Sequence, residues 1–208
     1  IGGGTGLSTL LRGMKAHTAN LTAIVSVADD GGSTGRLREQ LGIPAVGDIR
    51  NCLVAMAETE PVMGELLQYR FGVDEGSLSG HAVGNLLITA MNAIDGGDFE
   101  AAVRQMNRVL AVRGSVVPAA GTALTLHARL RDGSEVTGQS RVARMREIDR
   151  VWLEPGDVRA SRDALRAIAE ADIVVLGPGS LFTSLLATIL LPELRAALAA
   201  TSALRVYV

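Results

Sequence analysis

The stretch GGGTGLSTLLRGMK, residues 2–15, decides the fold class. Four glycines and a threonine run directly into a helical pattern over residues 8–15, which gathers its apolar side chains on one face: Leu7, Leu10, Leu11 and Met14. Glycine lets a ligand approach the main chain closely, and the unpaired N–H groups of a first helical turn favour an anion. The stretch therefore predicts a phosphate-binding loop at the start of a helix.

Two well-known phosphate loops can be compared with it residue by residue. A Walker loop needs Lys followed by Ser or Thr after its last glycine, but Leu7 and Ser8 follow Gly6. The dinucleotide fingerprint G-x-G-x-x-G is matched by Gly2 and Gly4, whereas Leu7 takes the third glycine position. The loop is a loose relative of that fingerprint. The alternatives are a tight glycine turn without ligand and a tubulin-type GTPase signature, from which Leu7 and Ser8 also depart.

The composition favours one globular domain and argues against nucleic acid and membranes as partners. The 208 residues are 48% hydrophobic and 20% charged, with a net charge of -2, so no basic surface for nucleic acid is expected. Cys52 is the single cysteine and lies in an apolar helical stretch, which predicts a buried thiol in a reducing compartment. No apolar run approaches the length of a membrane span, and no signal peptide precedes the glycines. We expect a cytoplasmic protein with no membrane insertion.

Both ends of the sequence look cut, and we expect a single domain over residues 1–208 that is truncated at each end. The chain begins at Ile1 without Met and ends on the strand-like run LRVYV.

Helices and strands alternate along most of the chain. LTAIVSVADD (21–30) predicts a buried strand, and helices follow at 47–58, 81–94 and 98–112, the last with Asp98 as N-cap. A helix capped by Ser161, a strand at 172–176, a helix after the Gly-Pro-Gly-Ser turn, a helix from Pro192 and a strand at 204–208 complete the pattern. This order favours an α/β fold, a Rossmann-like parallel sheet with helices on both faces.

One segment has a different period. In residues 122–142 the side chains of Leu124, Leu126 and Ala128 alternate with polar ones, and Asp132-Gly133 provides a turn. We predict a β-hairpin inserted into the parallel fold.

The carboxyl ends of parallel strands form the usual ligand-binding edge. Three turns are expected there: GGGTG (2–6), ADDGGSTGR (28–36) and GPGSLFTS (177–184). Two glycine-flanked helix starts, GDIRN (47–51) and GHAVGN (80–85), are expected to complete the rim.

The candidate ligand-binding residues come from these turns and helix starts. They are Gly3, Gly4, Thr5, Gly6, Leu7, Asp29, Asp30, Asp48, Arg50, Asn51, His81, Asn85, Gly177, Gly179, Ser180 and Thr183. The two glycine-led helices that follow residues 6 and 179 are expected to grip a diphosphate together. The catalytic residues stay unassigned.

Specific roles follow from position. Asp29 and Asp30 lie 23 and 24 residues after Gly6, where a dinucleotide fold holds a ribose hydroxyl. They could instead bind a divalent cation with phosphate, or cap their own turn. Asp48 is expected to cap its helix while Arg50 or Asn51 points to the ligand.

A few further polar side chains have both a ligand-binding and a structural interpretation. Arg36 either pairs with a phosphate or forms a solvated ion pair. His81 and Asn85 are spaced i, i+4 on one helix face, so they either reach one ligand or form part of the core. The scattered histidines and Cys52 lack zinc-ligand spacing, and GPGSL lacks the second glycine of a nucleophile elbow, so no metal cluster is predicted.

With these segments in order, the sequence resembles the gluconeogenesis factors of the YvcK type, relatives of the CofD-like phospholactate transferases in the UPF0052 superfamily. The matching stretches are IGGGTGLSTLLRGMK, VSVADDGGSTGRLREQLGIPAVGDIRNCL, YRF, LSGHAVGNLLI, VRGSVVPA, DRVWLEP and ADIVVLGPGSLFTSLL. After the Asp-Asp pair, GGSTGRLRE (31–39) follows the gluconeogenesis-factor pattern and departs from the transferase branch.

The resemblance implies a protein that binds a nucleotide sugar such as UDP-N-acetylglucosamine and supports cell shape and wall synthesis during gluconeogenic growth. It implies a homodimer, a regulatory kinase and cell-wall synthesis proteins as partners, and no firm cofactor. These proteins are longer at the C-terminal side, so further uridine- or sugar-binding residues are expected beyond RVYV. The alternative is a transferase that joins 2-phospho-L-lactate to a deazaflavin, with magnesium held by Asp29 and Asp30.

Overall fold

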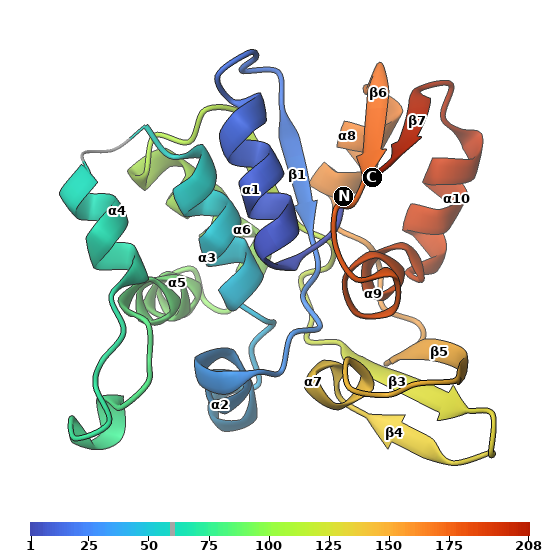
Figure 1. The fold of residues 1–208 in the computed structure, drawn as a ribbon. Helices are drawn as coiled ribbons and strands as arrows, with labels where there is room; N and C mark the ends of the chain where they lie inside the picture. The colour runs from blue at the N-terminus through green and yellow to red at the C-terminus, as the bar shows by residue number, and fades with distance from the viewer. Residues whose placement is uncertain (59–60) are drawn as a thin grey trace.

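The computed structural model describes residues 1–58 and 61–208 (Figure 1). The helices are α1 (Gly4–Met14), α2 (Gly32–Leu41), α3 (Gly47–Met56), α4 (Pro61–Gln68), the 3₁₀-helix η1 (Gly76–Leu78), α5 (Val83–Ile94), α6 (Phe99–Val109), α7 (Gln139–Val142), α8 (Arg162–Ala169), the π-helix η2 (Leu181–Leu186), α9 (Ala187–Ile189) and α10 (Pro192–Ala200). The strands are β1 (Thr22–Val25), β2 (Ser115–Pro118), β3 (Thr125–Leu130), β4 (Glu135–Thr137), β5 (Ile148–Glu154), β6 (Ile173–Leu176) and β7 (Leu204–Tyr207).

Two pairs of parallel strands form the centre of the fold. β1 pairs with β2, and β6 pairs with β7. The short segment Ile1–Gly2 joins the pairs: the Ile1 nitrogen donates to the Val175 carbonyl (2.8 Å), and the Gly2 N–H donates to the Ile24 carbonyl (3.1 Å). The spatial order is therefore β2, β1, Ile1–Gly2, β6, β7. This is the strand order of a Rossmann-type parallel sheet, with its switch point beside the segment Ile1–Gly2.

Helices cover both faces of this sheet. In Figure 1, α1 stands in front of β1, whereas α8 lies behind β6. α1 packs on α3, which contacts β1 and β2, and α6 and α8 contact β2. The buried apolar side chains of these elements, among them Leu11, Val25, Leu53, Phe99 and Ile168, form one continuous core. The α/β prediction is confirmed.

Cys52 lies in this core, fully buried on α3. Burial raises the pKa of its thiol far above the usual range, so the thiolate is not populated at neutral pH. The prediction of a buried thiol is confirmed.

Several predicted boundaries shift at helix starts. α1 begins at Gly4 instead of Ser8, because Gly3 is extended and the chain turns at once to bury Leu7 and Leu11. Asp98 caps α6 as predicted, accepting a hydrogen bond from the Ala101 N–H (2.9 Å). Ser161 is the N-cap residue of α8, as predicted, but its hydroxyl donates to Glu100 (2.9 Å) and makes no cap bond to the helix.

The Asp98 cap supports a first prediction. Asp98→Ala should lower the free energy of unfolding by about 1 kcal/mol, because the Ala101 N–H loses its acceptor. Urea denaturation measures the loss. Asp98→Asn keeps an acceptor oxygen and should stay close to wild type; an equal loss in both variants would contradict a capping role.

The inserted segment is a three-stranded antiparallel sheet in the order β4-β3-β5. The predicted hairpin, β3 and β4, is confirmed, with Leu126 and Ala128 fully buried. β5 was not predicted as a strand: only Leu153 on it is buried, so its sequence shows no clean alternation. In Figure 1 this sheet extends away from the parallel sheet, with α7 returning toward the loop that follows β1.

Among the described residues, no single helix is long and apolar enough to cross a membrane. The segments Leu181–Ile189 and Pro192–Ala200 together reach that length and apolar content, but the chain bends by 83° between them.

Candidate functional site

The two glycine loops predicted to hold phosphate pack against each other. A Cβ on Gly6 would lie 2.7 Å from the Pro178 carbonyl oxygen, and a Cβ on Gly179 would lie 3.5 Å from the Gly3 carbonyl oxygen. Glycine at residue 6 therefore permits close backbone contact at the switch point. The loops are neighbours, as predicted, and part of their glycine content serves this contact.

The carboxyl group of Asp48 lies at the start of α1. A Cβ on Gly3 would be 2.5 Å from Asp48 Oδ2, and the Gly4 N–H is hydrogen-bonded to this carboxyl. Burial raises the pKa of Asp48 to about 6; the negative charge of Asp29 adds to the shift, and Gly4 and Arg50 oppose it. The expectation that Asp48 caps its own helix is wrong: Val46 is the N-cap of α3, and Asp48 reaches across to α1.

The neighbouring carboxylates Asp29 and Asp30 point to different partners. Asp29 Oδ1 accepts a hydrogen bond from the Gly31 N–H (3.0 Å), and burial raises the pKa of Asp29, with Asp30 adding to the shift. Asp30 Oδ1 accepts from the Ser140 N–H (2.8 Å) at the start of α7. Gly138, at a φ of +100°, leaves room for the Asp30 carboxyl that a Cβ would occupy. Asp30 therefore attaches the inserted sheet, whereas Asp29 faces a cavity.

That cavity has a volume of about 350 Å³. It is lined by Asp29, Gly31, Gly32, Ser33, Thr34, Gly47, Asp48, Arg50, Asn51, Arg70 and Asn85. The first turns of α2 and α3 and the third residue of α5 meet here, so three helix starts surround one space. Five predicted site residues line it together: Asp29, Asp48, Arg50, Asn51 and Asn85.

A chain of polar side chains forms one wall of the cavity and continues behind it. Arg50 Nη1 donates to Asn85 Oδ1 (3.1 Å), and Asn85 Nδ2 donates to Ser33 Oγ (3.0 Å). Ser33 Oγ lies 3.0 Å from His81 Nδ1. Because Ser33 accepts from Asn85, its own proton can go to His81 Nδ1, which favours the tautomer protonated at Nε2. Burial lowers the pKa of His81, and Arg36 and Arg70 add to the shift.

The remaining predicted residues lie by the second glycine loop. Ser180 Oγ accepts a hydrogen bond from the Thr183 N–H (3.4 Å) and so caps the π-helix η2. Gln139 on α7 donates to the Thr183 carbonyl (2.6 Å). A diphosphate bound between Gly3–Gly6 and Gly177–Thr183 stays a prediction.

Sequence reasoning did not select Ser33, Thr34 and Arg70 as site residues. Ser33 and Thr34 stand in GGSTG directly after the aspartates, and their place in the first turn of α2 was the available signal. Arg70 lies in the loop after α4, where no local pattern indicates that it returns to α2 and α3. Arg36, considered for phosphate, donates to the Ser79 carbonyl on the exposed surface.

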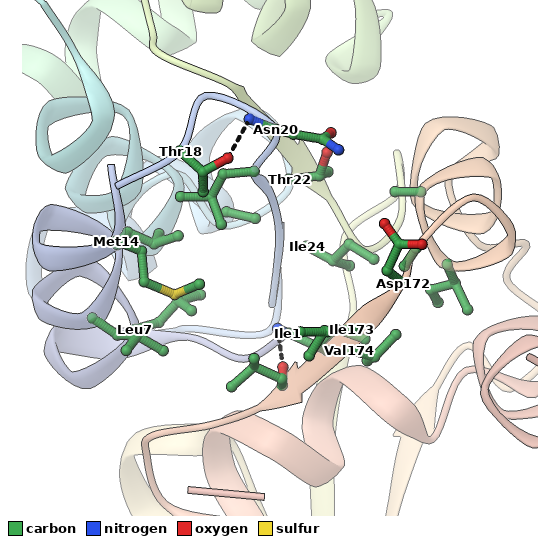
Figure 2. Close-up of a pocket in the computed structure, with 18 of the residues that line it drawn as sticks. Ile1, Leu7, Met14, Thr18, Asn20, Thr22, Ile24, Asp172, Ile173 and Val174 are labelled. Atoms are coloured by element: carbon green, nitrogen blue, oxygen red, sulfur yellow. Dashed lines mark hydrogen bonds between the residues drawn. The ribbon is translucent and has the colours of Figure 1, made fainter. Parts of the chain in front are cut away.

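A larger cavity of about 500 Å³ lies between β1 and β6 (Figure 2). It is lined mainly by apolar side chains of α1, β1 and β6, including Leu7, Met14, Ile24 and Val174. Figure 2 shows it between the facing edges of β1 and β6, beside Ile1. Its lining runs from Thr22 and Ile173, which begin these strands, to Gly177 just after β6, so the cavity extends along the space between the two strands. We interpret this apolar cavity as a gap between the two pairs of parallel strands, and not as a ligand-binding site.

The fold and the smaller cavity define a Rossmann-type protein with a polar, charged pocket beside its switch point. The family model of 2-phospho-L-lactate transferase CofD matches residues 1–208, and the chain belongs to this family.

Similar proteins include the gluconeogenesis factor of Halalkalibacterium halodurans, 49% identical over 208 residues, and that of Bacillus subtilis, 47% identical. A putative gluconeogenesis factor of Nostoc sp. is 50% identical. Each match covers the whole chain, which spans 64%, 65% and 45% of these relatives. A crystal structure of a UPF0052 family member from Bacillus halodurans matches with a TM-score of 0.95 at 49% identity, covering all of this chain and 67% of that one.

Proposed function

We propose that this protein is a gluconeogenesis factor that binds a nucleotide sugar of the UDP-N-acetylglucosamine type and acts in the cytoplasm to support cell shape and wall synthesis. The names of its relatives support the first part of the proposal. The observation that carries ligand binding is the pocket at the starts of α2, α3 and α5, which is lined by two arginines and two carboxylates.

This arrangement suits a ligand with two chemically different ends. Arg50 and Arg70 offer donors to phosphate oxygens. Asp29 and Asp48 accept hydrogen bonds, as the hydroxyl groups of a ribose or a hexose require. A sugar joined to a diphosphate carries both kinds of group on one molecule.

Calorimetric titration of the complete protein with UDP-N-acetylglucosamine tests the proposal. We expect saturable binding and an increase in melting temperature with ligand concentration. Absence of heat and of any thermal shift at millimolar ligand would remove the proposal. Titration with UDP and with N-acetylglucosamine separately would show which end carries the affinity.

A second candidate is a magnesium-dependent phospholactate transferase, favoured by the family match. Asp29 and Asp48 line the same pocket, whereas Asp30 is engaged by Ser140, so Asp29 and Asp48 would hold the cation. The described residues contain no cluster of three His, Cys, Asp or Glu side chains, and two carboxylates suit Mg²⁺, which keeps several waters. Magnesium-dependent release of GMP with a deazaflavin acceptor would support the transferase; nucleotide-sugar affinity independent of magnesium would count against it.

A further inference from the structure

We propose that the outer face of α5 is the contact surface of a homodimer, in which two copies of this chain pack α5 against α5 in antiparallel orientation about a twofold axis. The inference goes beyond the proposed function, because it concerns the association of the chain with itself and needs no ligand.

The helix α5 is apolar on the side that faces solvent. None of its 12 residues, Val83–Ile94, is charged, and its two asparagines, Asn85 and Asn92, are buried on the inner side. On the outer side Leu87 is 41% exposed and Ile94 is 76% exposed. A helix that borders water normally has polar or charged side chains on its outer face, whereas a helix that is apolar all round is normally buried. We therefore expect the outer face of α5 to be covered by protein.

The outer face of α5 is complementary to a second copy of itself. Its side chains follow the spacing i, i+3, i+4, i+7, which places Leu87, Ala90, Met91 and Ile94 in one stripe. In an antiparallel pair with the twofold axis between residues 90 and 91, Leu87 of each copy lies opposite Ile94 of the other. Ala90 then lies opposite Met91, so a small side chain leaves room for a long, flexible one. Such self-complementarity is what the isologous interface of a twofold dimer requires.

The neighbouring helix α4 enlarges this surface. It packs against α5, and the two helices lie together at one edge of the molecule, on the left in Figure 1. Val62 on α4 is 73% exposed, and Met63 and Leu66 are also exposed, whereas Glu65 is the one charged residue of the helix. Together with the stripe on α5 they present apolar area on the order of 500 Å² per copy, so a twofold contact would bury about 1,000 Å², the size at which specific interfaces begin.

The absence of charge along the stripe also favours self-association. Two identical surfaces necessarily present the same charges to each other, so a charged stripe would repel its own copy. Because α5 has no charged residue, this repulsion is absent where the two helices meet. The apolar area is then the main source of affinity for the second copy.

Analytical ultracentrifugation of the complete protein tests the dimer, which we expect in wild type at micromolar concentration. Leu87→Glu buries one carboxylate at each end of the contact and should weaken dimerisation at least about hundredfold. Leu87 is exposed, so this variant should keep the wild-type fold, which circular dichroism checks. Val109→Glu introduces the same charge at an exposed apolar position on α6, outside the surface, and should change the dimerisation constant less than about twofold.

Two further variants test the antiparallel pairing. Ile94→Lys combined with Leu87→Glu places an ammonium group opposite each new carboxylate, so the double variant should dimerise at least about tenfold more tightly than either single variant. Ala90→Cys brings two thiols beside the twofold axis and should form a disulfide-linked dimer with oxidised glutathione, which a non-reducing gel detects. The native Cys52 is fully buried and should not interfere. Val109→Cys should stay unlinked under the same conditions.

Each outcome decides the inference. A monomeric wild type at high micromolar concentration, or a wild-type dimer that Leu87→Glu leaves intact, would overturn α5 as the contact surface. A dimer that Leu87→Glu disrupts, without recovery in the double variant and without cross-linking of Ala90→Cys, would overturn the antiparallel pairing. Loss of the dimer in Leu87→Glu, recovery in the double variant and cross-linking at residue 90 would together confirm it.

Discussion

Gly6→Ala is expected to lower the free energy of unfolding by at least about 2 kcal/mol, because the new methyl group would lie 2.7 Å from the Pro178 carbonyl oxygen. Neither partner can move freely: Gly6 is in the first turn of α1, and Pro178 follows Gly177, whose N–H is bonded to the Ile1 carbonyl (2.9 Å). The loops must therefore separate at the switch point. Urea denaturation measures the loss, and ligand affinity should fall with it.

Gly13→Ala is the matched control. It makes the same change in the same helix, but nothing lies within 4 Å of the added Cβ. Because alanine is the better helix former, this variant should gain about 0.5–1 kcal/mol. Equal effects of the two substitutions would show that helix propensity, and not the contact between the glycine loops, decides the stability at Gly6.

Asp48→Asn should stabilise the protein by about 2 kcal/mol at pH 7.5. The pKa of Asp48 is raised from 3.8 to about 6 by burial, so its ionised form is disfavoured in the folded state relative to the unfolded state. The free-energy cost is fully present above pH 6 and disappears as the pH falls toward 3.8. Asparagine keeps an acceptor oxygen for the Gly4 N–H but carries no charge. Its advantage in unfolding free energy should therefore shrink by about half or more at pH 4.5.

Chemical denaturation at the two pH values measures this difference, and Asp74→Asn on an exposed loop provides the same change without burial. Asp74→Asn should leave stability unchanged at both. If Asp48→Asn destabilises at pH 7.5, the carboxylate contributes more through its hydrogen bonds than it loses through burial. Weaker ligand binding in the stabilised variant would indicate that Asp48 is retained for the pocket at a cost in stability.

The fold could be predicted because its signals are local. The alternation of helix and strand, the period of two in β3 and the cap at Asp98 each depend on neighbouring residues. β5 was not predicted because Leu153 is its only buried side chain, so its sequence lacks the alternation of buried and exposed residues that indicates a strand. The start of α1 was misplaced because glycines were assigned to a loop, although two of them lie in the first turn of the helix.

The sequence indicated which residues belong to the candidate site, but it did not show which of them contact one another. Asp29 was selected from the turn after the first predicted strand, and Arg50 and Asn85 from helix starts; all three line one pocket. Adjacent residues such as Asp29 and Asp30 separate, because successive side chains of a turn point in different directions, and no local pattern shows that Asp30 meets Ser140. Arg70 reaches the pocket through a loop whose path only the tertiary structure fixes.

The attachment of the inserted sheet has a practical consequence for labelling. Two residues at the start of α7 connect the inserted sheet to two different parts of the candidate site. The Ser140 N–H donates to Asp30 in the loop after β1, and the Gln139 amide donates to the Thr183 carbonyl beside the second glycine loop. The turn at Asp132–Gly133 is the exposed far tip of the same sheet, and its hydrogen bonds within the described residues are local. A fluorophore or affinity tag inserted at that tip should leave both hydrogen bonds intact. An insertion at residues 138–140 should disturb the loop after β1 and the second glycine loop at the same time.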